Sequence, residues 1–418
     1  MSLAQAPTPP NAWRLAPRNA YIDPFYVMEL GKAADQLANQ LAVQPGAHHR
    51  RVVRLNIGEP DHGAAPAVRQ AAAQALHDGA LPYTAALGLP ELRQRIAQWY
   101  TQHHGVTVSP SRVVVTAGAS AALQLACLAL VGQDDEVLIP DPSYPCNRNF
   151  VHAVGGQAVA LDCPPEQRYQ PTAEQVAQAW GARTRALLLA SPSNPTGTSL
   201  NWDELERLAQ VVRQRHGLLL ADEIYTGLSF DPAYGRTALA LAPELAEHVI
   251  SVNSFSKYFG MTGWRLGWLV LPERLVPAVE KLAQNLYICP STLSQRAALA
   301  CFEPSSLAWY EQRRLDLQHR RDAVLPRLQA VGLDVPVAPD GAFYIWADCR
   351  GLCQRLGIAQ TAEAGSWALA FALLERAQVA LAPGRDFGQR HTHHFVRLSL
   401  ASGMDDWQEA LLRLESLA

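Results

Sequence analysis

The chain has 418 residues, of which 49% are hydrophobic and 17% are charged, with a formal net charge of −3 at pH 7. This length predicts two domains or more, and the composition excludes bulk disorder. The small net charge argues against nucleic acid or an anionic membrane as the main partner. No apolar run is long enough to span a membrane, and the seven unpaired-looking cysteines favour a reducing cytoplasm.

The first part of the chain predicts short elements separated by turns. Residues 1–20 are rich in proline and alanine, and we expect an N-terminal arm without a secretory signal. A helical pattern then runs to residue 43, and a strand over 52–57 ends at Gly58-Glu-Pro-Asp61, a turn sequence. Helices are expected over 65–78 and 91–104.

From residue 90 on, apolar runs of four to six residues alternate with helical patterns. Strands are expected at 113–116, 136–139, 186–190, 217–221, 249–253 and 266–271, with helices at 119–131 and 203–215 among them. Continuous apolar runs indicate strands that are covered on both faces. The sequence therefore predicts an α/β fold with a mostly parallel, doubly wound sheet.

The pattern changes near residue 300. A long charged helix over 306–331 precedes a strand at 343–346, a helix near 363–376, a strand at 395–399 and a last helix from residue 405. This order predicts a smaller α+β domain. We expect the large domain to span residues 60–300 and the small domain to combine residues 21–59 with 301–418. We expect no metal site.

The segment Ser254-Phe-Ser-Lys257-Tyr-Phe-Gly-Met-Thr-Gly-Trp-Arg265 lies between two predicted strands. A lysine is costly to bury, and desolvation lowers its pKa as a Schiff-base nucleophile requires. Arg265 suits a phosphate, with Ser254 as a neutral donor beside it. This set fits pyridoxal 5′-phosphate. The alternatives are a solvated loop lysine and the Ser-x-x-Lys start of a penicillin-recognising enzyme, whose other motifs the chain lacks.

Other expected strand ends carry side chains that suit the same cofactor. Asp222 can keep a pyridinium nitrogen protonated, or it can only cap the next turn. Tyr225 and Asn194 can donate to a phenolate oxygen, although Asn194 also fits a plain loop. Two further candidates are the turn Gly118-Ala119-Ser120, whose amides suit a phosphate, and Tyr144, a stacking ring or a core tyrosine.

In this order, the segments resemble the class I/II aminotransferases of the fold-type I pyridoxal-phosphate enzymes, from about residue 20 to the C-terminus. The resemblance implies that Lys257 forms the Schiff base, that Asp222 contacts the pyridine nitrogen, and that Tyr225 and Asn194 contact the phenolic oxygen. The residues that match the phosphate site are Gly118, Ala119, Ser120, Ser254 and Arg265, and Tyr144 matches the stacking aromatic. Tyr83 matches a tyrosine that reaches the phosphate in the neighbouring subunit, which implies a homodimer with shared active sites. Arg397 and Gly58 match residues that bind the substrate α-carboxylate.

The predicted function is therefore a pyridoxal-phosphate-dependent aminotransferase with a ping-pong mechanism between an amino acid and a 2-oxo acid. Residues 286–292 contain no arginine where aspartate-specific enzymes carry one, and Ser120 stands where another branch has a lysine. An acidic side chain would then be buried unpaired, so we expect a neutral amino donor. Candidate apolar walls are Phe25, Tyr26, Tyr287 and Phe343.

Three alternatives stay open at this point. The first is another reaction on the same fold, a lyase or a decarboxylase, and a retained carboxylate clamp argues against decarboxylation. The second is a serine hydrolase that uses Ser120 in an elbow-like turn with His391, His393 or His394. This reading leaves Lys257 and Arg265 unexplained. The third is a regulator that binds the cofactor without catalysis, for which the N-terminal arm is too short to add a DNA-binding module.

Overall fold

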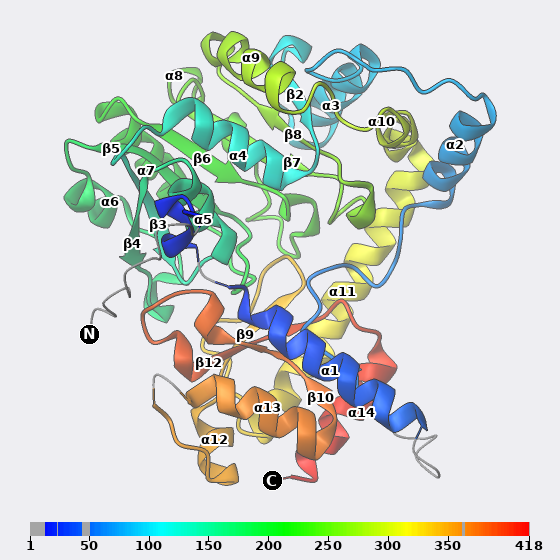
Figure 1. The fold of residues 1–418 in the computed structure, drawn as a ribbon, viewed down its shortest axis with the longest axis vertical. Helices are drawn as coiled ribbons and strands as arrows, with labels where there is room; N and C mark the ends of the chain where they lie inside the picture. The colour runs from blue at the N-terminus through cyan, green and yellow to red at the C-terminus, as the bar shows by residue number, and fades with distance from the viewer. Residues whose placement is uncertain (1–12, 23, 44–50, 362–363, 418) are drawn as a thin grey trace.

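The computed structural model describes residues 13–22, 24–43, 51–361 and 364–417 (Figure 1). Most of the expected N-terminal arm, residues 1–12, lies outside these ranges. Its remaining part includes a 3-10 turn, Pro17–Tyr21, and Arg18 donates a hydrogen bond to the backbone oxygen of Ala153 at 3.1 Å. The end of the arm therefore contacts helix α5 (Pro145–Ala153).

Seven strands form the larger sheet, in the order β2-β8-β7-β6-β5-β3-β4. Their bounds are β2 Val113–Thr116, β3 Glu136–Asp141, β4 Gln157–Asp162, β5 Thr184–Ala190, β6 Leu218–Asp222, β7 Val249–Ser254 and β8 Gly267–Val270. Strands β4, β3, β5, β6 and β7 are parallel, and β8 is antiparallel to β7 and β2. The predicted mostly parallel sheet is confirmed. Strand β4 was missed; it is an edge strand whose short run of small apolar residues is only partly buried, with Leu161 as its one buried side chain.

Helices cover both faces of this sheet, which explains the apolar runs (Figure 1). One face packs against α2 (Pro66–His77), α3 (Pro90–His104), α6 (Ala173–Ala179), α7 (Trp202–Gln214) and α10 (Thr292–Ala298). The other face packs against α4 (Ala119–Leu130), α5 and α9 (Val276–Leu286). Neighbouring residues such as Leu187 and Leu188 on β5 face opposite helix layers, and both are fully buried.

A second core joins the two ends of the chain (Figure 1). It contains α1 (Tyr26–Val43), β1 (Val53–Arg54), β9 (Tyr344–Asp348), α12 (Arg350–Leu356), α13 (Gly365–Ala377), β10 (Val379–Ala380), β12 (Phe395–Ser399) and α14 (Met404–Glu415). Strand β12 lies between β11 (Ala382–Pro383) and β9 in an antiparallel sheet, and β1 pairs in parallel with β10. The strand expected over 52–57 is short because the chain beyond β1 turns into a cavity wall.

The long helix α11 (Pro304–Ala330) contributes to both cores. Tyr310 packs in the core of the large sheet, whereas Leu317, Val324 and Leu328 pack in the second core. The domain boundaries that we expect at residues 60 and 300 stay a prediction. Among the described residues, no helix combines the length and apolar character needed to cross a membrane. Within the same ranges, no group of three or more His, Cys, Asp or Glu side chains is arranged to hold a metal ion.

Candidate active site

A cavity of about 370 Å³ opens where the parallel strands end and the second core begins. Its walls contain most of the candidate residues from the sequence. These are Gly58, Ala119, Ser120, Tyr144, Asn194, Asp222, Tyr225, Ser254, Lys257, Arg265 and Arg397. Such a site at the carboxyl ends of parallel strands is the usual ligand position in open α/β sheets.

Lys257 lies in the loop after β7, and its amine points across the cavity. The Nζ atom donates a hydrogen bond to the backbone oxygen of Gly58 at 2.6 Å. Burial, together with the positive charge of Arg397, lowers the pKa of Lys257 to about 8. At pH 7 about a tenth of this amine is therefore unprotonated and nucleophilic, far more than for a solvated lysine.

Asp222 is the last residue of β6 and is 3% exposed. Its Oδ1 atom accepts a hydrogen bond from the backbone of Ile224 at 3.3 Å. Burial, together with the negative charge of the neighbouring Glu223, raises the pKa of Asp222 to about 7. A buried carboxyl with one long hydrogen bond has free acceptor capacity, which suits a protonated ring nitrogen in the cavity.

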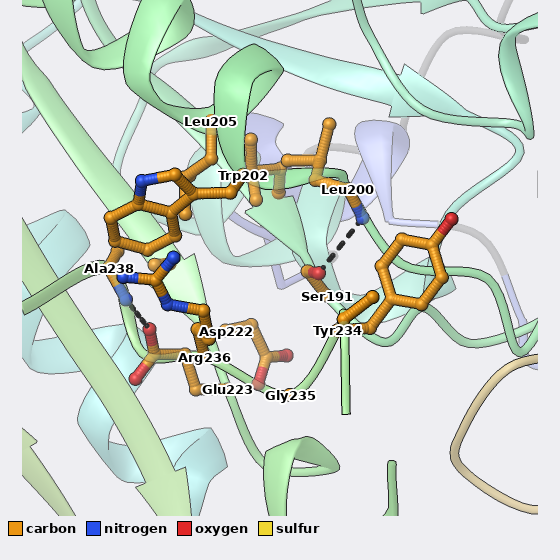
Figure 2. A pocket seen from close by; sticks show the side chains of 13 residues that line it. Ser191, Leu200, Trp202, Leu205, Asp222, Glu223, Tyr234, Gly235, Arg236 and Ala238 are labelled. Atoms are coloured by element: carbon orange, nitrogen blue, oxygen red, sulfur yellow. Dashed lines mark hydrogen bonds between the residues drawn. The ribbon is translucent and has the colours of Figure 1, made fainter. Parts of the chain in front are cut away.

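Figure 2 shows a second pocket, which is lined by both Asp222 and Glu223, whereas only Asp222 also lines the active-site cavity. The Glu223 carboxylate accepts hydrogen bonds from the backbone of Ala238 at 2.6 Å, from Thr237 at 2.8 Å and from Ser251 at 2.6 Å. These three donors satisfy Glu223 inside the protein. Of the two adjacent carboxyl groups, only Asp222 is therefore available to a ligand of the cavity.

Two tyrosines meet on the cavity wall. The hydroxyl of Tyr225 lies 3.0 Å from that of Tyr344, on β9. Tyr344 was missed from the sequence because nothing in its strand marks it apart from Phe343. Its position on the wall depends on the antiparallel pairing of β9 with β12, which aligns Trp346 with Arg397.

Arg397 is the central residue of β12 and is 3% exposed. Its Nη1 atom donates to Oδ1 of Asn194 at 2.9 Å, and its Nη2 atom donates to the backbone oxygen of Asn56 at 3.0 Å. Both acceptors are neutral, so the charge of the guanidinium is not compensated by these contacts. A carboxylate in the cavity would compensate it with a charge-assisted hydrogen bond.

On another part of the cavity wall, Arg265 lies against the start of helix α4. Gly118 precedes α4 with a φ of +86°, and a Cβ atom there would lie 2.6 Å from Nη2 of Arg265. Arg265 itself adopts a left-handed φ of +52°. The guanidinium thus lies against the N-terminal turn of a twelve-residue helix, whose free amides favour a phosphate.

Two serines on the cavity wall, Ser254 and Ser256, differ in their hydrogen bonds. Ser254 already accepts a hydrogen bond from the backbone of Ser256 at 3.0 Å and donates to that of Leu266 at 3.4 Å. In contrast, Oγ of Ser256 is buried on the cavity wall without a partner. Ser256 is therefore the hydroxyl with an unmet hydrogen bond, and it was missed although the Ser-x-Ser-Lys spacing marked it.

Several expected residues lie outside the cavity. Tyr83 is 79% exposed and is not on the cavity wall of its own chain. Of the candidate apolar walls, Phe25 lines the cavity, whereas Tyr26, Tyr287 and Phe343 do not. Tyr26 packs against Trp367, and Tyr287 donates to Gln124 at 2.6 Å. The sequence left open whether these rings line the cavity or pack elsewhere, and in this chain they have other partners. Ser120 lines the cavity, but His391, His393 and His394 do not.

Solved structures with the same architecture are aminotransferases. The chain matches the crystal structure of an aminotransferase from Mycobacterium tuberculosis with a TM-score of 0.88 and 40% identity, over 97% of this chain and 99% of that chain. It matches the Thermus thermophilus aspartate aminotransferase with maleate with a TM-score of 0.86 and 31% identity, over 97% and 100% of the two chains. The fold and the site define an enzyme of the aminotransferase fold type I.

Sequence relatives agree with this class. The valine–pyruvate aminotransferase of Mycobacterium tuberculosis is 39% identical over 397 residues, which cover 95% of this chain and 97% of that protein. The aspartate aminotransferase of Rhizobium meliloti is 34% identical, over 87% and 88% of the two chains. The family described as aminotransferase class I and II matches residues 50–413. The chain belongs to this family and is a transaminase, which transfers an amino group between an amino acid and a 2-oxo acid.

Proposed function

We propose that this aminotransferase binds pyridoxal 5′-phosphate, the cofactor typical of its family, in the cavity described above. Three features of the cavity wall support this proposal. The pKa of the Lys257 amine is lowered, the carboxyl of Asp222 can accept further hydrogen bonds, and the hydroxyl of Ser256 has no hydrogen-bond partner. Lys257 would hold the aldehyde carbon covalently, and Arg265 with the α4 N-terminus would hold the phosphate. When bound, the cofactor supplies an electron sink for the substrate Cα.

The remaining roles follow from the chemistry of each side chain. Asp222 keeps the ring nitrogen protonated, while Tyr225 and Asn194 donate to the phenolic oxygen and Tyr144 stacks on the ring. Arg397 binds the substrate α-carboxylate and thereby orients the Cα–H bond, and Gly58 contributes backbone polar atoms beside it. The Lys257 amine, released when substrate binds, takes the Cα proton as a general base. Two such half-reactions, first with an amino acid and then with a 2-oxo acid, give ping-pong kinetics.

The lysine content of the chain makes this proposal simple to test, because Lys32, Lys257 and Lys281 are its only lysines. The holoenzyme should be yellow, and Lys257→Ala should lose both the visible absorbance band and the half-reaction with amino acids. Lys32→Ala and Lys281→Ala, which remove exposed lysines, are the matched controls and should keep both. Reduction with borohydride followed by peptide mapping should label Lys257 alone. Label on another lysine, or a band that survives in dialysed Lys257→Ala, would contradict the proposal.

We further propose a homodimer in which Tyr83 reaches the cofactor phosphate of the partner. The exposed position of Tyr83, outside the cavity of its own chain, supports this arrangement, as do the exposed apolar side chains of Leu286 and Ile288. A cytoplasmic location is the accompanying proposal. It is supported by the seven cysteines, all of which are free thiols.

For the substrate, we propose a neutral amino donor. Part of the cavity lining is apolar and is formed by Phe25, Val27, Met28 and Ile57. The two arginines on the wall, Arg265 and Arg397, already have the proposed roles of binding phosphate and α-carboxylate. The valine–pyruvate relative, whose name gives a neutral amino acid and a neutral 2-oxo acid, supports the same choice. A dicarboxylate would leave its distal charge against apolar groups, at a cost of several kcal/mol.

A further inference from the structure

The first turn of α1 is held by a carboxylate from the far end of the chain. The backbone N–H of Tyr26 donates to Oδ1 of Asp386 at 3.0 Å, and that of Val27 donates to Oδ2 at 2.7 Å. The first amides of a helix have no partners inside the helix, and a side chain at its start usually accepts from them. Phe25, which precedes α1, has no polar side chain for this purpose. Asp386, 2% exposed, therefore caps α1 from a distance of 360 residues in sequence.

A neighbouring contact fixes the same turn. The guanidinium of Arg385 lies 3.9 Å from the ring centroid of Tyr26 and 5.0 Å from that of Trp367. The backbone oxygen of the next residue, Asp386, accepts a hydrogen bond from Nη2 of Arg148 on α5 at 2.9 Å. Residues 385 and 386 thus connect α1 to helix α5, which packs on the large sheet.

The next residue connects this loop to the proposed carboxylate clamp. The ring centroid of Phe387 lies 4.9 Å from the guanidinium carbon of Arg397. Phe387 is fully buried in a small cluster with Val27, Trp346 and Ala382, and Phe25 packs against this cluster. Two consecutive residues of one loop therefore make different contacts. Asp386 contacts α1, which carries part of the apolar wall, and Phe387 contacts Arg397, which would bind the α-carboxylate.

We propose that Asp386 is a positioning residue for substrate selectivity: by capping α1, it holds Val27 and Met28 as the wall against which the side chain of the amino donor packs. This inference rests on the proposed function of the cavity. Without the cap, the buried amide of Val27 and the partly buried amide of Tyr26 lose their acceptors, and the first turn of α1 loosens. Selectivity among apolar side chains then falls, because a wall that moves discriminates poorly between them.

The test compares single-turnover rates of the holoenzyme with alanine, valine and leucine, followed by loss of the visible band. In Asp386→Ala, the ratio of second-order rate constants for valine over alanine should fall about tenfold from the wild-type ratio. Asp386→Asn keeps one acceptor and should give an intermediate ratio. The matched control is Glu204→Gln. Glu204 is a buried carboxylate that accepts from the backbone of Ala173 at 2.6 Å, at the start of α6, away from the cavity. This control should keep the wild-type ratio.

Equal slowing of all three donors in Asp386→Ala, with the ratio unchanged, would overturn the inference, since it would indicate a structural role alone. If Asp386→Ala does not load the cofactor, Arg385→Ala provides the second test. It removes the contacts with Tyr26 and Trp367, leaves the Asp386 cap in place, and should shift the ratio in the same direction by a smaller factor. An unchanged ratio there would also overturn the inference. Failure of the proposed function is distinguishable, because the wild-type protein would then show no visible band before any donor is added.

Discussion

The hydroxyl groups of Tyr225 and Tyr344 lie 3.0 Å apart, and Tyr344 also donates a long hydrogen bond, 3.5 Å, to the backbone oxygen of Gly58. The three residues come from the loop after β6, from β9 and from the turn after β1. A tyrosine hydroxyl has one proton to donate and can accept at the same time. When Tyr344 donates its proton to Tyr225 instead of to the distant Gly58 oxygen, Tyr225 can direct its own proton toward the cavity. Tyr344 thereby orients a group that we propose to contact the cofactor.

Removal of the Tyr344 hydroxyl should therefore weaken catalysis without abolishing it. Loss of one buried hydrogen bond costs about 1 kcal/mol, so Tyr344→Phe should lower kcat/KM by about fivefold. Tyr225→Phe should have a larger effect and should also shift the visible band. Tyr310→Phe is the control, because this buried hydroxyl contacts Cys301 at 3.5 Å away from the cavity. The prediction fails if Tyr344→Phe and Tyr310→Phe have the same kcat/KM.

The lowered pKa of Lys257 predicts a pH-dependent stability of the cofactor-free protein. This pKa is about 8 in the folded protein, whereas an unfolded chain has its lysine pKa near 10.4. Between these values the unfolded state binds more protons, so the contribution of Lys257 to the free energy of unfolding rises with pH. Below pH 8 the penalty is complete, and Lys257→Met should be the more stable protein by up to about 3 kcal/mol. Urea unfolding at several pH values should find this difference shrinking from pH 8 to pH 10. A constant difference would contradict the prediction.

The unpaired hydroxyl of Ser256 should contribute to cofactor affinity. A hydrogen bond to a charged group contributes about 1.5–3 kcal/mol, so Ser256→Ala should raise the Kd for pyridoxal 5′-phosphate by at least about tenfold. Ser306→Ala is a matched control, since Oγ of Ser306 on α11 is equally buried and unpartnered but lies outside the cavity wall. Spectroscopic titration of the cofactor-free proteins gives both constants. Equal affinities for the two variants would exclude a contact between Ser256 and the phosphate.

The proposed exchange of Tyr83 between subunits predicts complementation. Tyr83→Ala and Lys257→Ala should each be poorly active, but a heterodimer of the two contains one site with both residues intact. Mixed and reassembled protein should therefore recover part of the wild-type activity. The measurement is steady-state turnover of heterodimers isolated by two different affinity tags. Verified heterodimers that remain as inactive as the parents would refute sharing of Tyr83.

The choice of a neutral donor is tested by a panel of amino acids in single-turnover spectroscopy. We expect valine, alanine or another neutral donor to react faster than aspartate, because the apolar wall would desolvate the second carboxylate. If aspartate reacts at least tenfold faster than every neutral donor, which corresponds to about 1.4 kcal/mol in the barrier, the proposed substrate class is wrong.

The central sheet and the residues at its strand ends could be predicted because their signals are local. Buried parallel strands are continuous apolar runs, and Lys257, Asp222 and Arg265 stand next to such runs in the sequence. Edge strand β4 carries only a short run of mainly small apolar residues, and only one of its side chains is buried. Tyr344 and Asp386 were missed for a different reason. Their functional neighbours, Tyr225 and Tyr26, are 119 and 360 positions away, and only the register of β9 and β12 and the docking of α1 bring them together.

The capping of α1 by Asp386 also has a consequence for biosynthesis. A ribosome makes Tyr26 and Val27 early, yet the carboxylate that completes their helix appears only after more than 350 further residues. Strand β1 likewise cannot pair until β10 has been synthesised, since Val53 pairs with Val379. During translation, the nascent chain can complete the large sheet first while its first helix remains without a docking surface. Chaperones that bind exposed apolar helices would meet this segment for most of the synthesis time, and the apolar wall of the cavity would be assembled last.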